Sequence, residues 1–302
     1  MAVGYLHAPA TTTSERVGRT VALLGRRGYA VTPARLGELC IGGPLDADAV
    51  RWAVAASPDL AIAEELVLQR DALDRAASIR LRSLGHDAHA ATYSRLAVDL
   101  VRTLVTFVPF VRCVCIAGSL ASGGFRATDD VDLNLIVDDG HRHLAYVAVN
   151  VLGVLHALRF RGKPVDELTR RPLAPRLMTA NLILERSQCG PLVRQDEDMA
   201  FELLVGEPVF GPEVLRDVVS ENPGLVEHFP QLAERRATPA VETPARRAPE
   251  ALYPRFLEAP ARWLGHAAWR YMQWTRRGSP QALARVAFVR ETMRPYTLFD
   301  AK

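Results

Sequence analysis

One stretch, residues 115 to 137, limits what this chain can fold into more than any other. It reads Cys-Ile-Ala-Gly-Ser-Leu-Ala-Ser-Gly-Gly-Phe-Arg-Ala-Thr-Asp-Asp-Val-Asp-Leu-Asn-Leu-Ile-Val. An apolar run ends at Gly118-Ser119, and about ten residues later a second apolar run opens with Asp130-Val131-Asp132. Because side chains alternate along a strand, the two aspartates point to the same side and can share one cation. The stretch therefore predicts a strand, the start of a helix, and a second strand that begins with acidic residues.

The residue types at these positions suit a phosphate and a divalent cation. Glycine at position 118 lets the backbone approach a phosphate, and Ser119 offers a hydroxyl and an N–H at a helix N-terminus, where anions are favoured. Hard divalent cations take carboxylate oxygens, which Asp130 and Asp132 supply. The alternative is a polar turn in which Asp129-Asp130 acts as a cap. We favour the phosphate and metal site, because the Gly-Ser pair stands at the right distance between two apolar runs.

At these positions the chain resembles the polymerase-beta-like nucleotidyltransferase superfamily, and the matching residues are Gly118, Ser119, Asp130, Val131, Asp132 and Leu133. The resemblance implies an α+β fold, with a mixed sheet and flanking helices. It also implies transfer of a nucleoside monophosphate from a nucleoside triphosphate (NTP), such as ATP, to a hydroxyl or amine, with release of pyrophosphate. Mg²⁺ or Mn²⁺ would be bound by Asp130 and Asp132, and the phosphates by Gly118 and Ser119. More weakly, the chain looks like a bacterial subgroup of predicted nucleotidyltransferases with a winged-helix-like N-terminal region.

The family implies a third carboxylate on a later strand, and two residues are candidates for it. Glu185 ends the plausible strand of residues 180–184, whereas Asp166 follows the preceding helical pattern. The third possibility is that this carboxylate is absent. Because it usually serves as the general base for the incoming nucleophile, its loss would leave nucleotide binding without catalysis.

The hydrophobic periodicity and the breaker residues divide the chain into five predicted regions. The last of them contains an amphipathic helix with three tryptophans, which we interpret as residues that dock this helix onto the core. In order, the regions are a winged-helix-like domain of three helices and two short strands (1–70), connecting helices (71–107), the nucleotidyltransferase core (108–233), a flexible linker rich in Pro, Ala, Thr and charge (234–250), and a C-terminal helical segment (251–302).

Charge gives only weak information about partners. The formal net charge is +3 and the pI is near 8.8, and the basic residues are spread along the chain. Phosphate-backbone binding normally shows a clustered positive surface, so a small molecule or a protein is favoured slightly over a tRNA as the second substrate. The third predicted helix has no dense Lys/Arg patch, which argues against DNA binding. A nucleotide-sensing regulator that uses the winged helix to contact DNA or a protein is the alternative function.

The sequence also favours a soluble, cytoplasmic protein with no membrane partner. No stretch approaches roughly 18 consecutive apolar residues, and the N-terminus lacks the apolar core of a secretory signal. The four cysteines, Cys40, Cys113, Cys115 and Cys189, show no paired CxxC spacing. We therefore expect buried, reduced thiols and no zinc site.

Overall fold

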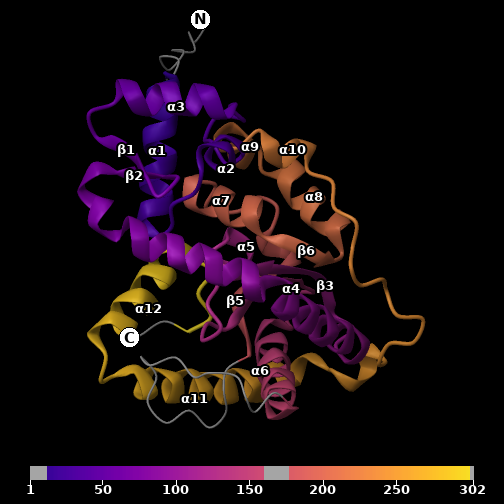
Figure 1. The fold of residues 1–302 in the computed structure, drawn as a ribbon. Coiled ribbons are helices and arrows are strands. Elements are labelled where there is room, and N and C mark those ends of the chain that lie inside the picture. The colour runs from indigo at the N-terminus through magenta and orange to yellow at the C-terminus, as the bar shows by residue number, and fades with distance from the viewer. Residues whose placement is uncertain (1–11, 160–176, 300–302) are drawn as a thin grey trace, which may run out of the picture. The chain divides into compact units, whose positions relative to one another are not determined.

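The structure is a computed structural model and describes residues 12–159 and 177–299. The chain is α+β, as predicted, with helices around two separate sheets (Figure 1). Contacts between residues divide it into two compact units. The first unit consists of Met1–Leu81 with Glu227–Gln231, and the second consists of Arg82–Val226 with Leu232–Lys302.

The first unit has the element order predicted for the N-terminal region. Its helices begin at residues that are recognisable as caps: Thr12 and Glu15 form a capping box, Thr32 precedes a proline, and the Asp46 side chain accepts from the N–H of Ala49. The unit extends to Leu81 and not to residue 70. Its elements are α1 (Thr13–Arg26), α2 (Pro33–Glu38), α3 (Ala47–Ala56), β1 (Leu60–Ala63), β2 (Leu66–Gln69), η1 (Arg70–Arg75) and the first residues of α4 (Ala76–Phe107).

A short antiparallel hairpin closes the first unit. β1 and β2 pair from Leu60 opposite Gln69 to Ala63 opposite Leu66. The two residues between the strands, Glu64 and Glu65, have φ of 51° and 62°, as a tight two-residue turn of the I′ type requires. The chain accepts this conformation at two glutamates, without the Asn-Gly or Asp-Gly that usually marks such a turn.

The second unit is built on a four-stranded sheet in the order β5-β4-β3-β6. β3 pairs antiparallel with both β4 and β6, whereas β4 and β5 are parallel, so the sheet is mixed. β3 leads directly into the short helix α5. These elements are β3 (Val111–Ala117), α5 (Gly118–Ser122), β4 (Val131–Val137), β5 (Met178–Glu185) and β6 (Glu207–Phe210).

The two faces of this sheet differ in polarity, and β4 shows the difference. Val131, Leu133 and Leu135 point into the core that the sheet shares with α4 and α6 (Arg142–Arg159). Asp132 and Asn134 point to the opposite face, where Asn134 contacts α7 (Glu197–Val205). The alternation that predicted a shared side for the acidic residues therefore also separates them from the apolar core.

Helices and short turns complete the second unit. α11 packs against α6 and, through α12, is linked to α7. The remaining elements are η2 (Arg186–Gln188), α8 (Pro212–Glu221), α9 (Pro223–His228), α10 (Gln231–Glu234), η3 (Glu250–Leu252), η4 (Arg255–Leu257), α11 (Glu258–Arg276) and α12 (Pro280–Met293), of which residues 227–231 belong to the first unit.

The segment predicted as a flexible linker, 234–250, is attached to the second unit at Val241 and at Arg247. It forms neither a long helix nor a strand, but Val241 is buried and its N–H donates to the carbonyl of Val209 at 2.9 Å. The Arg247 guanidinium donates to the carbonyls of Val105 and Val111 at 2.9 and 3.1 Å. Its Pro-rich composition prevents regular structure, but side-chain and backbone hydrogen bonds supply the attachment that composition does not reveal.

Across the part of the chain that the structure describes, no helix has both the length and the apolar character that crossing a bilayer requires.

Candidate functional site

The predicted Gly-Ser turn and the two aspartates lie together at one edge of the sheet. Ala117, the last residue of β3, is paired with Asp132 on β4, so the chain enters α5 directly beside the acidic residues. Gly118 has a φ of +60°, and a β-carbon at this position would lie 2.1 Å from Oδ2 of Asp132. The position thus requires glycine both for its backbone conformation and for the space that the carboxylate occupies.

Thr179 connects the two aspartates. Its side-chain Oγ1 is 3.0 Å from Oδ2 of Asp130 and 3.0 Å from Oδ1 of Asp132. Thr179 lies directly opposite Asp132 in the parallel pairing of β4 and β5. A threonine in a strand carries no sequence signal for such a role, because the role depends on the register of the strand pair.

The closeness of the two aspartates changes the acidity of Asp132. Burial of its carboxyl group and the neighbouring charge of Asp130 raise the pKa of Asp132 to about 7. The hydrogen bond from Thr179 and the positive charge of Arg285 act in the opposite direction, and Glu202 adds to the rise. At neutral pH the pair is therefore poised to hold a proton, and a divalent cation between the two carboxylates would displace it.

Asp129 organises the loop beside this pair. It is buried, and its Oδ2 accepts from Oγ of Ser119 and from the N–H of Arg126, both at 3.2 Å. Arginines approach the same carboxylate from two helices, with Arg82 Nη2 at 3.6 Å and Arg285 Nη1 at 3.9 Å. Asp129 thus holds the Ser119 hydroxyl and two arginine side chains next to Asp130. From the sequence alone, Asp129 is predicted only as part of a polar turn.

Glu185 does not belong to this site, so it is not the third carboxylate. It lies opposite Val137, at the other end of the β4–β5 pair from Asp132, and five residues along a strand correspond to about 16 Å. Its Oε1 accepts from the N–H of Gly140 at 2.8 Å, which fixes the turn after β4. The other candidate, Asp166, lies outside the described residues.

A different glutamate lies on the same face of the sheet as Asp132. Oε1 of Glu202, on α7, accepts from Nδ2 of Asn134 at 2.9 Å and from Nδ2 of Asn181 at 3.2 Å. Only 7% of Glu202 is exposed, so it sits beneath the site and contributes negative charge without reaching the surface. It was not anticipated, because its sequence neighbours are apolar residues of an ordinary core helix.

The donor set fits a magnesium or manganese ion that is shared with a substrate. Within residues 12–159 and 177–299, no group of three or more His, Cys, Asp or Glu side chains has an arrangement that could hold a metal by itself. Mg²⁺ is usually bound through one or two carboxylates together with substrate phosphates and water. Asp130 and Asp132 can supply those two carboxylates. The four cysteines are free and buried, as expected from the sequence.

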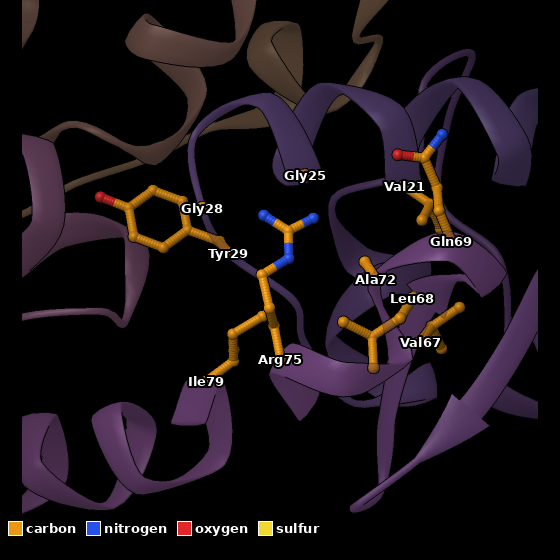
Figure 2. Close-up of a pocket in the computed structure, with 10 residues that line it drawn as sticks. All are labelled: Val21, Gly25, Gly28, Tyr29, Val67, Leu68, Gln69, Ala72, Arg75 and Ile79. Carbon is orange, nitrogen blue, oxygen red and sulfur yellow. The ribbon is translucent and has the colours of Figure 1, made fainter. Parts of the chain in front are cut away.

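The first unit offers a small recess and a helix face as other possible sites. On the exposed side of α3, Arg51 forms an ion pair with Asp48 at 2.5 Å, so this side is not a basic surface. Figure 2 shows a recess where α1, β2 and η1 meet, with Arg75 between Tyr29 and apolar side chains. Neither feature includes a residue of the Gly-Ser and Asp-Val-Asp motif.

Comparisons of the chain with protein-family models, with curated proteins and with solved structures found no match. The geometry of the second unit is therefore the basis for a functional proposal.

Proposed function

We propose that this protein is a metal-dependent nucleotidyltransferase, whose active site is the edge of the sheet formed by Gly118, Ser119, Asp130 and Asp132. The observation that carries the proposal is the contact between Gly118 and Asp132, which leaves no space for a β-carbon. The glycine keeps the backbone at the start of α5 open and directly beside the acidic pair. A site that admits phosphate next to a cation makes use of such an approach of the backbone.

Each residue has a proposed part in the reaction. The backbone of the Gly118-Ser119 turn receives the phosphates of an NTP, and Arg82 and Arg285 add positive charge beside Asp129. Asp130 and Asp132 hold Mg²⁺ or Mn²⁺, which neutralises the triphosphate and polarises the attacking hydroxyl when bound. The acceptor hydroxyl or amine forms a bond to the α-phosphorus as the bond to the bridging oxygen breaks. Pyrophosphate leaves with the electron pair of that bond, and the acceptor proton passes to water.

The architecture supports this proposal in two respects. The motif residues stand at the ends of two neighbouring strands in a mixed sheet with flanking helices, as expected for a polymerase-beta-like core. The helix, helix, helix, hairpin order of the first unit agrees with the order expected for a winged helix. We propose both assignments on these grounds.

The test is transfer of label from each of the four α-labelled NTPs, with Mg²⁺ or Mn²⁺, to acceptors in a cell extract. The variant Asp130→Asn/Asp132→Asn removes the proposed cation ligands. The matched control, Asp71→Asn/Asp74→Asn, removes two exposed aspartates of η1. We expect transfer by the wild type and the control but not by the site variant, and the labelled product identifies the acceptor as a small molecule, a protein or a tRNA. Equal transfer by the site variant would refute the assignment.

One observation favours a second function, a nucleotide-binding regulator that does not transfer. The residue opposite Asp132 on the adjacent strand is Thr179, where a catalytic carboxylate would have been well placed. ATP binding that depends on Asp130 and Asp132, with no label transfer under any condition, would support this function. A protein is then the favoured partner of the first unit, because the exposed face of α3 is not basic.

A further inference from the structure

Helix α11 presents an ordered row of aromatic and arginine side chains on its outer face. The row consists of Trp263, Arg270, Trp274 and Arg277, at spacings of seven, four and three residues. Such spacings place side chains on one side of a helix, along a length of about 21 Å. All four residues are exposed, including 74% of Trp263 and 47% of Trp274. We call this row the α11 stripe.

Helix α11 packs against the core through the face opposite the stripe. The residues of the stripe are therefore not needed to hold the helix in place. Ala261, Gly265 and Thr275 are buried, and a β-carbon at Gly265 would meet the Phe299 ring at 2.8 Å. Trp269 packs against the core, with Arg290 positioned 5.0 Å from the centre of its ring. The expectation that all three tryptophans dock the helix is thus met by Trp269 alone.

The stripe is also positively charged. After Glu258, α11 contains no acidic residue, and the helix with its C-cap carries four arginines. Oε1 and Oε2 of Glu258 accept hydrogen bonds from the N–H groups of His143 and Leu144, so this carboxylate is engaged at the start of α6. The mild charge of the whole chain conceals this local excess.

We propose that the α11 stripe binds single-stranded nucleic acid. Aromatic side chains that accept stacked bases, combined with arginines that contact phosphates, are the two components of such surfaces. Arg277 lies 5.1 Å from the centre of the Trp274 ring and Tyr271 stacks on the same ring, so these contacts restrain the indole while 47% of Trp274 stays exposed. This inference goes beyond the proposed transfer reaction and does not depend on it.

An anionic bilayer is a poorer fit to the same residues. A helix that lies in a membrane interface separates its apolar face from its basic face. On α11, Arg270 stands on the same line as Trp263 and Trp274, so burying the indoles in lipid would also bury a guanidinium. Single-stranded nucleic acid offers bases to the tryptophans and phosphates to the arginines along the same line.

The experiment measures fluorescence anisotropy of labelled 20-nucleotide single strands of RNA and of DNA with the full-length protein. Two variants remove the components separately: Trp263→Ala/Trp274→Ala and Arg270→Gln/Arg277→Gln. The control, Arg51→Gln/Trp52→Ala, changes an exposed arginine and an exposed tryptophan on α3. All of these side chains are at the surface, and circular dichroism melting checks that each variant folds.

We expect both stripe variants to weaken binding by about tenfold or more, whereas the control binds like the wild type. The arginine variant should also lower the salt dependence, by about 0.7 in the slope of log K against log salt for each arginine removed. The RNA and DNA arms show which strand is preferred. Undiminished binding by both stripe variants, or no binding by the wild type in low salt, would overturn the proposal. Binding only to phosphatidylserine vesicles, or loss only of self-association in the stripe variants, would also overturn it.

Discussion

Gly118 and Asp132 are in such close contact that the hydrogen of the glycine is the largest substituent the site admits, since a β-carbon would lie 2.1 Å from the carboxylate oxygen. The contact lies where β3 ends and β4 begins. Because of it, the addition of one methyl group, by a glycine to alanine substitution, tests the proposed site.

Gly118→Ala should abolish cation binding, and Gly123→Ala should not. Both glycines have positive φ, of +60° and +89°, so each substitution carries a backbone cost of about 1–2 kcal/mol. A β-carbon at Gly123 meets nothing within 4 Å, so Gly123→Ala is the matched control for backbone strain. Mn²⁺ titration calorimetry and thermal denaturation of both variants separate the two effects. Equal Mn²⁺ affinity in the two proteins would contradict the proposed site.

Thr179→Val should move cation binding to higher pH. The substitution keeps the shape of the side chain but removes the hydroxyl, whose hydrogen bond lowers the pKa of Asp132. Without it the carboxyl holds its proton to higher pH, so a cation competes less well near neutrality. The measurement is Mn²⁺ affinity between pH 6 and 9, with Thr179→Ser as the variant that retains the hydroxyl. An unchanged pH profile in Thr179→Val would show that Thr179 does not act on the pair.

The aspartate pair should destabilise the folded protein as the pH rises from about 4 to about 7. Asp132 has a pKa of about 7 in the folded state, against 3.8 as its ordinary value. In that window the unfolded chain binds fewer protons than the folded one, so stability falls as the pH rises. Relative to Asp132→Asn, the wild type should lose up to about 4 kcal/mol of unfolding free energy across the window.

Urea denaturation of both proteins at several pH values checks this difference. Added Mg²⁺ should restore part of the loss above pH 7, because the cation binds the ionised pair. A difference between the two proteins that stays constant with pH would mean that Asp132 titrates at its ordinary value.

Arg285→Ala should weaken ATP binding about three- to tenfold, and more strongly in low salt. Arg285 stands 3.9 Å from Asp129 and its charge lowers the pKa of Asp132, so it lies beside the space proposed for the phosphates. Calorimetric titration with ATP and Mg²⁺ measures the effect. Arg216→Ala, which removes an exposed arginine of α8, is the control. If the two variants bind ATP equally, the phosphates do not lie near α12.

Much of the fold was predictable because its causes are local. Thr32 before Pro33 and the Asp46 cap marked two helix starts, and the apolar runs marked β3 and β4. Glu185 ends a strand-like run, but the sequence does not show in which direction its strand pairs with the strand of Asp132. β4 and β5 are parallel, so Glu185, at the end of β5, lies at the opposite end of the pair from Asp132.

Strand alternation and glycine conformation act over a few residues, so the order of residues is enough to predict that Asp130 and Asp132 share a side and follow a Gly-Ser turn. Tertiary packing joins Thr179 to the pair, brings Arg285 from a distant helix, and leaves Trp263 in solvent while Trp269 is packed. These relationships depend on which surfaces pack together over long separations, and that choice is made by the whole core and not by any one segment.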